Sequence, residues 1–450
     1  MRIPSQVDQS GETGRKLPRD AAAVSGKNGG GAAWRRQLLG LAAAACLVKL
    51  ALWSVLILPR APAWSARFAD GARIDYDDKE YFATARLLAA RGELLRPEAE
   101  PPYRQVYRTP GYPVILAALG TATGWQPALT VLLQALLLSA LAPVAALLLR
   151  RLGRPPAAAW ILVADPLTNL ISLSFMTEIW LALCLLLALL AWLEGRQRPV
   201  WRAAALLLFA LAVLIKPSVQ YFLLVAFALT LLHCPNRRAT LALAAAACLP
   251  LAAWAWRNHE VCGRYCLSTQ LDACVMAPIT LEALERGVPI RTVIGEWDRA
   301  LGVQTMKVIM DNKLDFVDQT RAYLRAHRGA FVKYHVLGMG RVLFGTAREH
   351  VAQVFHGGAP LPGAGGRIYD AALVLYTLAL YGATLFGFRP RLLRDPACQF
   401  AVLFVLYNVA LIGIYAYTTG GGLKRAPFIP FIVLLLAAGL AARRPAAARP

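Results

Sequence analysis

The sequence is 450 residues long, and 58% of its residues are hydrophobic. Soluble domains contain about 45–50% apolar residues, so this composition excludes an ordinary soluble fold and indicates an integral membrane protein. Lys and Arg number 48 against 26 Asp and Glu, which gives a net charge of +22. The basic residues fall in short clusters between apolar runs, and no nucleic-acid-binding motif accompanies them. We therefore expect topology signals and no nucleic-acid partner.

The N-terminal segment, residues 1–34, is largely polar and includes a glycine run at positions 29–31. Such a segment cannot bury enough apolar surface to fold, so we expect a disordered cytoplasmic tail. A cleavable signal peptide begins with a much shorter basic segment. The first apolar run is therefore expected to stay in the membrane.

About ten apolar runs approach the roughly 20 residues that a membrane-spanning helix needs. They are residues 37–58, 127–149, 157–173, 176–193, 203–215, 219–232, 241–256, 368–388, 400–417 and 428–441. Runs near Asp165-Pro166 and Lys216-Pro217 are short or interrupted, so the count is open by about one or two helices. The predicted fold class is an all-α polytopic membrane protein.

Charge predicts the topology. An N-terminus on the inner side places arginines in every predicted inner loop, as the positive-inside rule requires. The same alternation collects five polar segments on the outer face, where we expect the functional site. These segments are residues 75–113, Thr177-Glu178, Lys216-Pro217-Ser218, Arg257-Asn258-His259 and Lys424-Arg425.

The apolar runs also predict the domain organisation. A transmembrane module occupies residues 35–257 and contains a first outer loop at residues 59–126. Residues 258–366 form an extracytoplasmic helical region, because charged and apolar residues alternate there at helical spacing. Residues 367–450 contain the C-terminal transmembrane helices and a short cytoplasmic tail.

The cysteines do not suggest a metal site, since CxxC spacing is absent. Cys262, Cys266 and Cys274 lie outside the predicted spans, where an oxidising compartment permits one disulfide between two of them. The sequence leaves the pairing open.

The first outer loop contains a capped helix. Asp77 is the expected N-cap, Glu80 the return partner of a capping box, and Gly92 the C-terminal stop. An apolar stripe predicts that this helix lies along the membrane surface. The stripe consists of Phe82, Ala85, Leu88 and Ala89. Residues 111–124 predict a second interfacial helix, and a purely capping role for Asp77 and Asp78 is the alternative to a functional one.

These motifs occur in an order that resembles the GT-C membrane glycosyltransferases. More narrowly, they resemble the branch related to dolichyl-phosphate-mannose protein mannosyltransferases and to the bacterial aminoarabinose transferase of lipid A. The motifs are Asp77-Asp78 with Tyr81, then Arg108-Thr109-Pro110-Gly111-Tyr112-Pro113, Thr177-Glu178, Lys216-Pro217, Arg257-Asn258 and Arg425 with Pro427 and Pro430. The resemblance covers about residues 35–440. Protein mannosyltransferases carry Asp-Glu at the first position, where this chain has Asp77-Asp78.

The resemblance implies an inverting enzyme of the bacterial inner membrane. Such an enzyme moves a sugar from a polyprenyl-phosphate carrier to a glycan, lipid or protein acceptor on the outer side. It also implies a module of seven N-terminal spans. The sugar, the acceptor and the oligomeric state stay open.

Each candidate site residue has a chemical role. The resemblance makes Asp77 or Asp78 the catalytic residue, and a carboxylate near an acceptor hydroxyl can act as general base. The leaving lipid phosphate needs positive charge, for which arginine suits best. Candidates for this role are Arg425 first, then Lys216, Arg257, Arg108 and Lys424. Each of these has the alternative role of a snorkelling interfacial residue.

Glu178 and Tyr81 are assigned to positioning of the acceptor or of a metal. Glu178 could bind a divalent ion, the one cofactor left open, or cap the span that it begins. Two other classes of protein compete with the enzyme: a multi-span transporter and a non-catalytic envelope polysaccharide assembly protein. Transporters place ionisable residues near the bilayer midplane and usually contain internal repeats, neither of which the sequence favours.

Overall fold

The computed structural model describes residues 29–69, 77–97, 103–269, 276–301, 317–355, 363–418 and 421–443. In this part of the chain, regular structure is helical apart from one isolated bridge between Leu95 and Arg104. Within these described ranges, seven helical segments are long and apolar enough to cross a membrane, and three shorter apolar helices accompany them. The predicted all-α polytopic membrane fold is confirmed.

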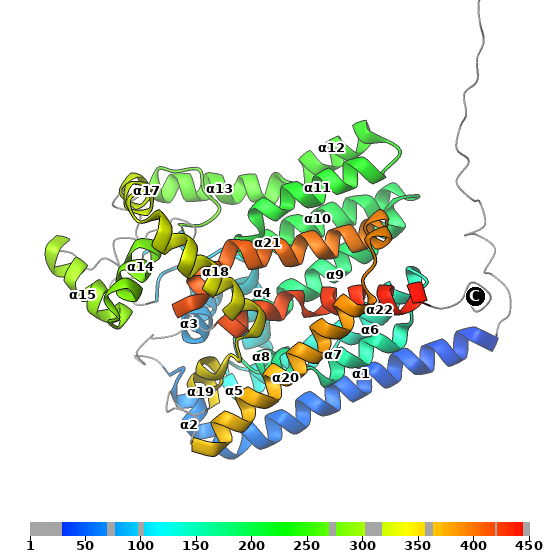
Figure 1. Cartoon of the computed structure of the whole chain (residues 1–450), viewed down its shortest axis with the longest axis horizontal. Helices are drawn as coiled ribbons and strands as arrows, with labels where there is room; N and C mark the ends of the chain where they lie inside the picture. Colours follow the sequence, from blue (N-terminus) through cyan, green and yellow to red (C-terminus); the bar gives the residue numbers. More distant parts are fainter. Residues whose placement is uncertain are drawn as a thin grey trace, which may run out of the picture.

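The helices are arranged as a bundle with additional helices at one end (Figure 1). The α-helices are α1 (Gly29–Leu56), α2 (Ala61–Ala66), α3 (Asp77–Arg91), α4 (Gly111–Ala122), α5 (Pro127–Leu138), α6 (Leu141–Arg151), α7 (Trp160–Ala164), α8 (Pro166–Ser172), α9 (Glu178–Gly195), α10 (Pro199–Ile215), α11 (Gln220–His233), α12 (Arg237–Ala247), α13 (Leu249–Cys262), α14 (Met276–Arg286), α15 (Ile290–Leu301), α17 (Val317–Ala326), α18 (Arg328–Phe344), α19 (Arg348–Phe355), α20 (Gly363–Gly387), α21 (Pro396–Thr418) and α22 (Ile429–Arg443). The 3-10 helices are η2 (Leu58–Arg60), η3 (Pro156–Ala159), η4 (Pro217–Val219), η6 (Pro390–Arg394) and η7 (Gly421–Phe428).

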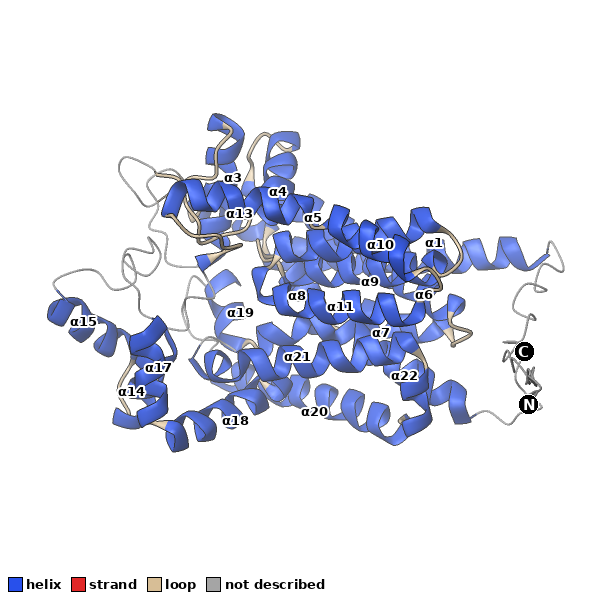
Figure 2. Cartoon of the chain, turned by 90° about the horizontal axis from the view of Figure 1, so that it is seen from above, coloured by secondary structure: helices blue, strands red, loops and turns tan. Residues whose placement is uncertain are grey.

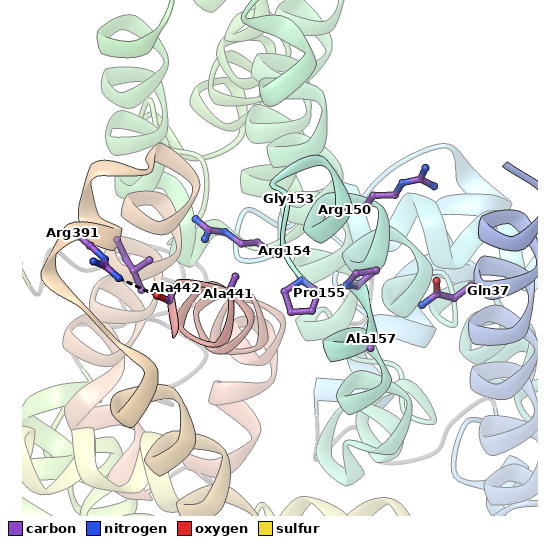
Figure 3. A pocket seen from close by; sticks show the side chains of 11 residues that line it. Gln37, Arg150, Gly153, Arg154, Pro155, Ala157, Arg391, Ala441 and Ala442 are labelled. Carbon is purple, nitrogen blue, oxygen red and sulfur yellow. Dashed lines mark hydrogen bonds between the residues drawn. The ribbon is translucent and has the colours of Figure 1, made fainter. Parts of the chain in front are cut away.

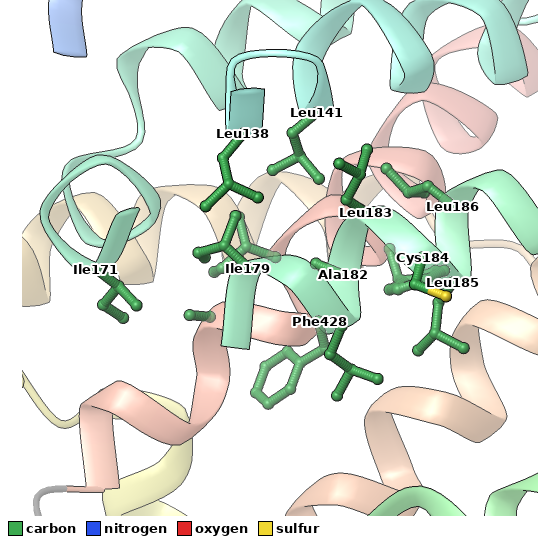
Figure 4. Close-up of a cluster of buried hydrophobic side chains, with 14 of the residues drawn as sticks. Leu138, Leu141, Ile171, Ile179, Ala182, Leu183, Cys184, Leu185, Leu186 and Phe428 are labelled. Carbon is green, nitrogen blue, oxygen red and sulfur yellow. The ribbon is translucent and has the colours of Figure 1, made fainter. Parts of the chain in front are cut away.

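Helices α9 and α22 form the centre of the bundle, and most of their side chains are buried. Both consist almost entirely of apolar residues, which allows them to be buried on all sides. Figure 4 shows part of this core, in which Leu138 and Leu141 face α9 from one side and Phe428 lies on the other. The core fixes the position of the α9 start relative to η7.

One expected span is not a continuous helix. Residues 157–173 contain η3, α7 and α8, and the chain breaks at Asp165 with an extended backbone. Pro166 lacks the N–H that a continuing helix needs, and the Asp165 carboxylate accepts a hydrogen bond from the Thr168 N–H as an N-cap. The prediction of a full span here was therefore wrong.

The last residues of the expected tail belong to the first helix. Helix α1 begins at Gly29, so residues 29–34 are helical, whereas residues 1–28 lie outside the described residues. Strong helix propensity of alanines at 32–33 and the apolar run that follows explain the earlier start.

The additional helices lie at the end of the bundle opposite the start of α1. Figures 1 and 2 place α3, α14, α15 and α17 there, with α18 leading back toward the bundle. The predicted helical character of residues 258–366 is confirmed for the described part. Helix α18 packs against α21, where the His335 Nε2 lies 2.8 Å from the Ala410 carbonyl oxygen. The domain boundaries stay predictions.

Candidate functional site

Six charged side chains from four of the predicted polar segments gather at this end of the bundle. They are Asp77, Glu80, Arg108, Glu178, Lys216 and Lys424, and we call them the charged cluster. Helix α3, the loop before α4, the start of α9, the end of α10 and η7 contribute them. Four of the five polar segments predicted to share one face therefore meet.

Arg108 holds the acidic half of the cluster together. Its guanidinium donates two hydrogen bonds to Glu80, at 3.1 and 2.6 Å, and one to Asp77 Oδ1 at 2.7 Å. A further bond reaches the Tyr81 hydroxyl at 3.1 Å. Burial lowers the pKa of Arg108, but the charges of Asp77 and Glu80 outweigh this and raise it well above its usual value. Arg108 is therefore a permanent cation in this position.

This arrangement corrects the role predicted for Glu80. Its carboxylate binds Arg108, 28 positions along the chain, and so does not serve as a capping-box partner. The helix does begin at Asp77 and end before Gly92, whose φ of +69° is the left-handed conformation of a helix stop. The apolar stripe is also placed differently from the prediction. Phe82 and Ala85 are buried in the protein core, so that part of the stripe faces protein.

Gly111 explains how the Arg108 loop reaches the end of α10. A Cβ atom at Gly111 would lie 2.6 Å from the Leu214 carbonyl carbon and 2.8 Å from the Ile215 nitrogen. The backbones of α4 and α10 are therefore in direct contact, which only glycine permits. Lys216 follows at the next position of the chain, so this contact brings Lys216 and the Arg108 loop together.

Asp78 faces a different partner from its neighbour. Its Oδ2 lies 3.1 Å from Arg67 Nη2, and the side chain is only 2% exposed. Burial raises the pKa of Asp78, and the Arg67 charge compensates only in part. Arg67 also donates to the Val354 carbonyl, so this pair joins α3 to α19. Asp78 has the environment of a structural residue.

Asp77 keeps an accessible carboxylate, since its side chain is 47% exposed. Burial raises its pKa, but the charges of Arg108 and Lys424 lower it by more and hold it at about 2. Asp77 is therefore ionised, and its field extends to the lysines of the cluster.

The basic half of the cluster surrounds Glu178. Lys216 Nζ lies 2.6 Å from Glu178 Oε1, and Lys424 Nζ lies 3.6 Å from the same oxygen. Glu178 is fully buried at the start of α9. Two lysines and one carboxylate carry one net positive charge, whereas Arg108 with Asp77 and Glu80 carries one net negative charge. The cluster is thus divided into two halves of opposite charge.

Close backbone contact also positions η7, which carries Lys424. A Cβ atom at Gly422 would collide with the Gly345 carbonyl and the Ala347 nitrogen, and one at Gly345 would lie 2.7 Å from the Gly422 nitrogen. Two glycines are therefore needed where the loop after α18 meets η7.

Two of the predicted phosphate ligands lie elsewhere. Arg425 is 1% exposed, donates to the Leu343 carbonyl at 2.9 Å and interacts electrostatically with Asp165. Arg257 donates to the carbonyls of Gln105 and Leu94, which ties α13 to the first outer loop. Lys424, rather than Arg425, faces the charged cluster. Residues one position apart on a helical segment face different sides, which the sequence alone could not resolve.

His350 was missed by the sequence reasoning. It is a buried residue of α19 whose Nε2 lies 3.1 Å from Ser174 Oγ. Burial lowers its pKa to about 4, although Glu178 raises it, so the imidazole is neutral. Glu178, Lys424 and Asp77 all interact with it electrostatically. A single histidine in a long polar segment gives no local signal for this position.

A divalent metal was the cofactor left open for Glu178. Among the described residues, no group of three His, Cys, Asp or Glu side chains could hold a metal ion. The cluster's carboxylates instead face cations. Asp75 and Tyr76 of the predicted loop, and Cys274 of the predicted disulfide, lie outside the described residues, whereas Cys262 is a free thiol.

The fold and this cluster define a polytopic α-helical membrane protein with a charged site at one end of its bundle. No family model and no curated protein matches the chain. Two solved structures are similar to it: the crystal structures of ArnT from Cupriavidus metallidurans in the apo state and bound to undecaprenyl phosphate. Each is 16% identical over 87% of this chain and 78% of that chain, with TM-scores of 0.36 and 0.31. TM-scores this low do not establish a shared fold.

Proposed function

We propose that the chain is a GT-C membrane glycosyltransferase that moves a sugar from a polyprenyl-phosphate carrier to an acceptor hydroxyl at the outer face of the inner membrane. The observation that carries this proposal is the electrostatic interaction of a half-exposed carboxylate, Asp77, with Lys216 and Lys424, which together outweigh the charge of Glu178. Transfer from a lipid phosphate needs a base beside a site for the leaving anion.

Asp77, rather than Asp78, is the proposed general base. Asp78 is 2% exposed and bound to Arg67, so an acceptor cannot reach it without breaking a buried ion pair. The Asp77 side chain is 47% exposed, while Arg108 fixes its Oδ1. A fixed carboxylate is effective because orientation reduces the entropic part of the barrier.

The proposed reaction is a single displacement. The acceptor oxygen forms a bond to the anomeric carbon, its proton passes to Asp77, and the bond from that carbon to the phosphate oxygen breaks. The electron pair stays on the polyprenyl phosphate, whose new charge Lys216 and Lys424 stabilise. One base and one leaving group on opposite sides of the sugar imply inversion of configuration.

Bound donor would also change the strength of the base. A carboxylate with a pKa of about 2 is a weak base, and the field of Lys424 contributes to this low value. A phosphate on the lysines compensates their charge, so the pKa of Asp77 rises when the donor is present. The site is thus a stronger base in the complex than in the free protein.

A transporter is the second candidate, because one polar network lies inside the bundle. Lys49 of α1 is 2% exposed and donates to Ser172 Oγ at 2.6 Å and to Asn169 Oδ1 at 3.3 Å. Ionisable residues at such depth are typical of transport pathways.

Envelope glycans and the carrier lipid distinguish these functions. We would compare the wild type, a deletion strain and strains producing Asp77→Asn or Lys49→Met at wild-type level. The transferase predicts that Asp77→Asn reproduces the deletion phenotype, since loss of a general base costs about 10²–10⁴-fold in rate. Normal envelope glycans in the Asp77→Asn strain would overturn the assignment of Asp77 as the general base. Loss of the glycan in the Lys49→Met strain alone would favour transport.

A further inference from the structure

A cavity of about 770 Å³ lies at the end of the bundle opposite the charged cluster. The start of α1, the end of α6, the loop into η3, η6 and the end of α22 form its walls. In Figure 1 this is the end where α1 begins and α22 ends. Under the topology proposed above, it is the cytoplasmic end.

Three arginines line this cavity: Arg150, Arg154 and Arg391. Figure 3 shows Arg391 and Arg154 near the end of α22, whereas Arg150 and Gln37 lie on the side of α1. Among the described residues, Arg154 alone of the three has a carboxylate partner, Asp395, at 2.9 Å. Arg391 donates to the Ala442 carbonyl at 3.0 Å, and Arg150 lies over the Trp34 ring. Three positive charges against one carboxylate leave a net charge of +2.

The cavity also has unused hydrogen-bonding capacity. Arg154 Nε is buried and has no hydrogen-bond partner in the described part of the chain. A buried donor without a partner is costly, so one residue of the cavity wall has a hydrogen-bonding requirement that the described protein groups do not meet. Apolar groups line the rest of the cavity, namely Pro155, Pro156, Ala157, Leu392, Ala441 and Ala442.

We propose that this cavity binds the phosphate group of an anionic membrane phospholipid. Arginine forks match phosphate oxygens, and basic pockets between transmembrane helices at the cytoplasmic side are typical sites for anionic head groups. The volume lies within the roughly 300–1,000 Å³ of small-ligand sites. The apolar residues contact the glycerol and the first acyl carbons. This site is separate from the charged cluster, and lipid binding to it does not depend on the proposed transfer reaction.

The experiment uses the purified full chain in a zwitterionic detergent. Its thermal unfolding is followed while short-chain phosphatidylglycerol, short-chain phosphatidylcholine or inorganic phosphate is added. The pocket variant is Arg150→Gln with Arg391→Gln. The matched control is Arg198→Gln with Arg238→Gln, which removes two exposed arginines at the starts of α10 and α12.

We expect phosphatidylglycerol to raise the midpoint of thermal unfolding in the wild type and in the control, up to a saturating lipid concentration. The pocket variant should need at least about tenfold more lipid, because each lost charge-assisted bond weakens binding substantially. Equal shifts with phosphatidylcholine, or an unchanged response of the pocket variant, would overturn the proposal. Saturation by inorganic phosphate at the same concentration as the lipid would assign the cavity to a free anion and overturn the lipid assignment.

A second measurement applies if the double variant does not fold. Native mass spectrometry of Arg391→Gln should show less bound phosphatidylglycerol than the wild type. Retention of the same amount would also count against the site.

Discussion

The ammonium group of Lys216 lies 2.6 Å from the fully buried carboxylate of Glu178, and this contact joins the end of α10 to the start of α9. The sequence around either residue does not indicate that the two would pair. Lys216 thus supplies a positive charge to the site, and the buried Glu178 carboxylate balances that charge inside the protein.

Removal of one member of this pair should be more harmful than removal of both. Lys216→Met leaves the Glu178 carboxylate with only the more distant Lys424, so we expect a loss of about 3–5 kcal/mol of stability. Lys216→Met with Glu178→Gln should recover much of that loss. Denaturant or thermal unfolding of the single and double variants measures the coupling, and additive effects would contradict it.

Lys424 and Arg425 should behave oppositely although they are adjacent. Lys424→Gln removes a loosely paired cation of the cluster, so we expect about tenfold weaker binding of the proposed polyprenyl-phosphate carrier with little change in stability. Arg425→Gln removes a buried donor to Leu343 and should destabilise the fold by on the order of 1–3 kcal/mol. Lipid titration and thermal unfolding of both variants provide the comparison. Equal effects of the two substitutions on binding would exclude the proposed orientation of η7.

His350 should make stability depend on pH. Its pKa of about 4 lies below its ordinary value of 6.5, so the unfolded chain binds more protons between these values. The contribution of the neutral His350 to the free energy of unfolding is therefore fully present above about pH 6.5. It is lost as the pH falls toward 4. In His350→Gln, the midpoint of thermal unfolding should differ less between pH 7.5 and pH 5 than it does in the wild type.

The matched control for this experiment is His233→Gln, since His233 faces the neutral Gln399. The control should retain the pH dependence of the wild type. If His350→Gln retains it as well, the buried neutral imidazole is not the cause.

Gly111→Ala should separate the Arg108 loop from the end of α10. The new Cβ would lie 2.6 Å from the Leu214 carbonyl, and overpacking of this kind costs about 1–3 kcal/mol. Activity should fall with stability, because Arg108 and Lys216 move apart. Gly40→Ala in α1 is the control, since nothing lies within 4 Å of its Cβ position. A Gly111→Ala protein as stable and active as the control would refute the close contact.

Much of this architecture could be predicted from sequence because its signals are local. Apolar runs identify the spans, and the start at Asp77 and the stop at Gly92 follow from helix-end chemistry. The break at Asp165-Pro166 was visible as an interruption, but its consequence, two short helices in place of a span, was not predicted.

The pairings in the site could not be predicted, because they join residues far apart in the chain. Glu80 was interpreted locally as a cap, whereas its partner, Arg108, lies in the next loop. Lys49 and His350 are single polar residues without a motif, and only the packed bundle brings them to Ser172 and Ser174. The choice between Lys424 and Arg425 depends on the rotation of η7.

The meeting of Gly345 and Gly422 links two parts of the molecule mechanically. No side chain separates the two backbones, so the segments are in direct contact. A shift of one segment is therefore expected to require a shift of the other. We therefore expect a displacement of α18, which begins among the helices beyond the bundle, to shift η7 and Lys424 with it. Binding of a partner to those peripheral helices should then change the position of the Lys424 ammonium group.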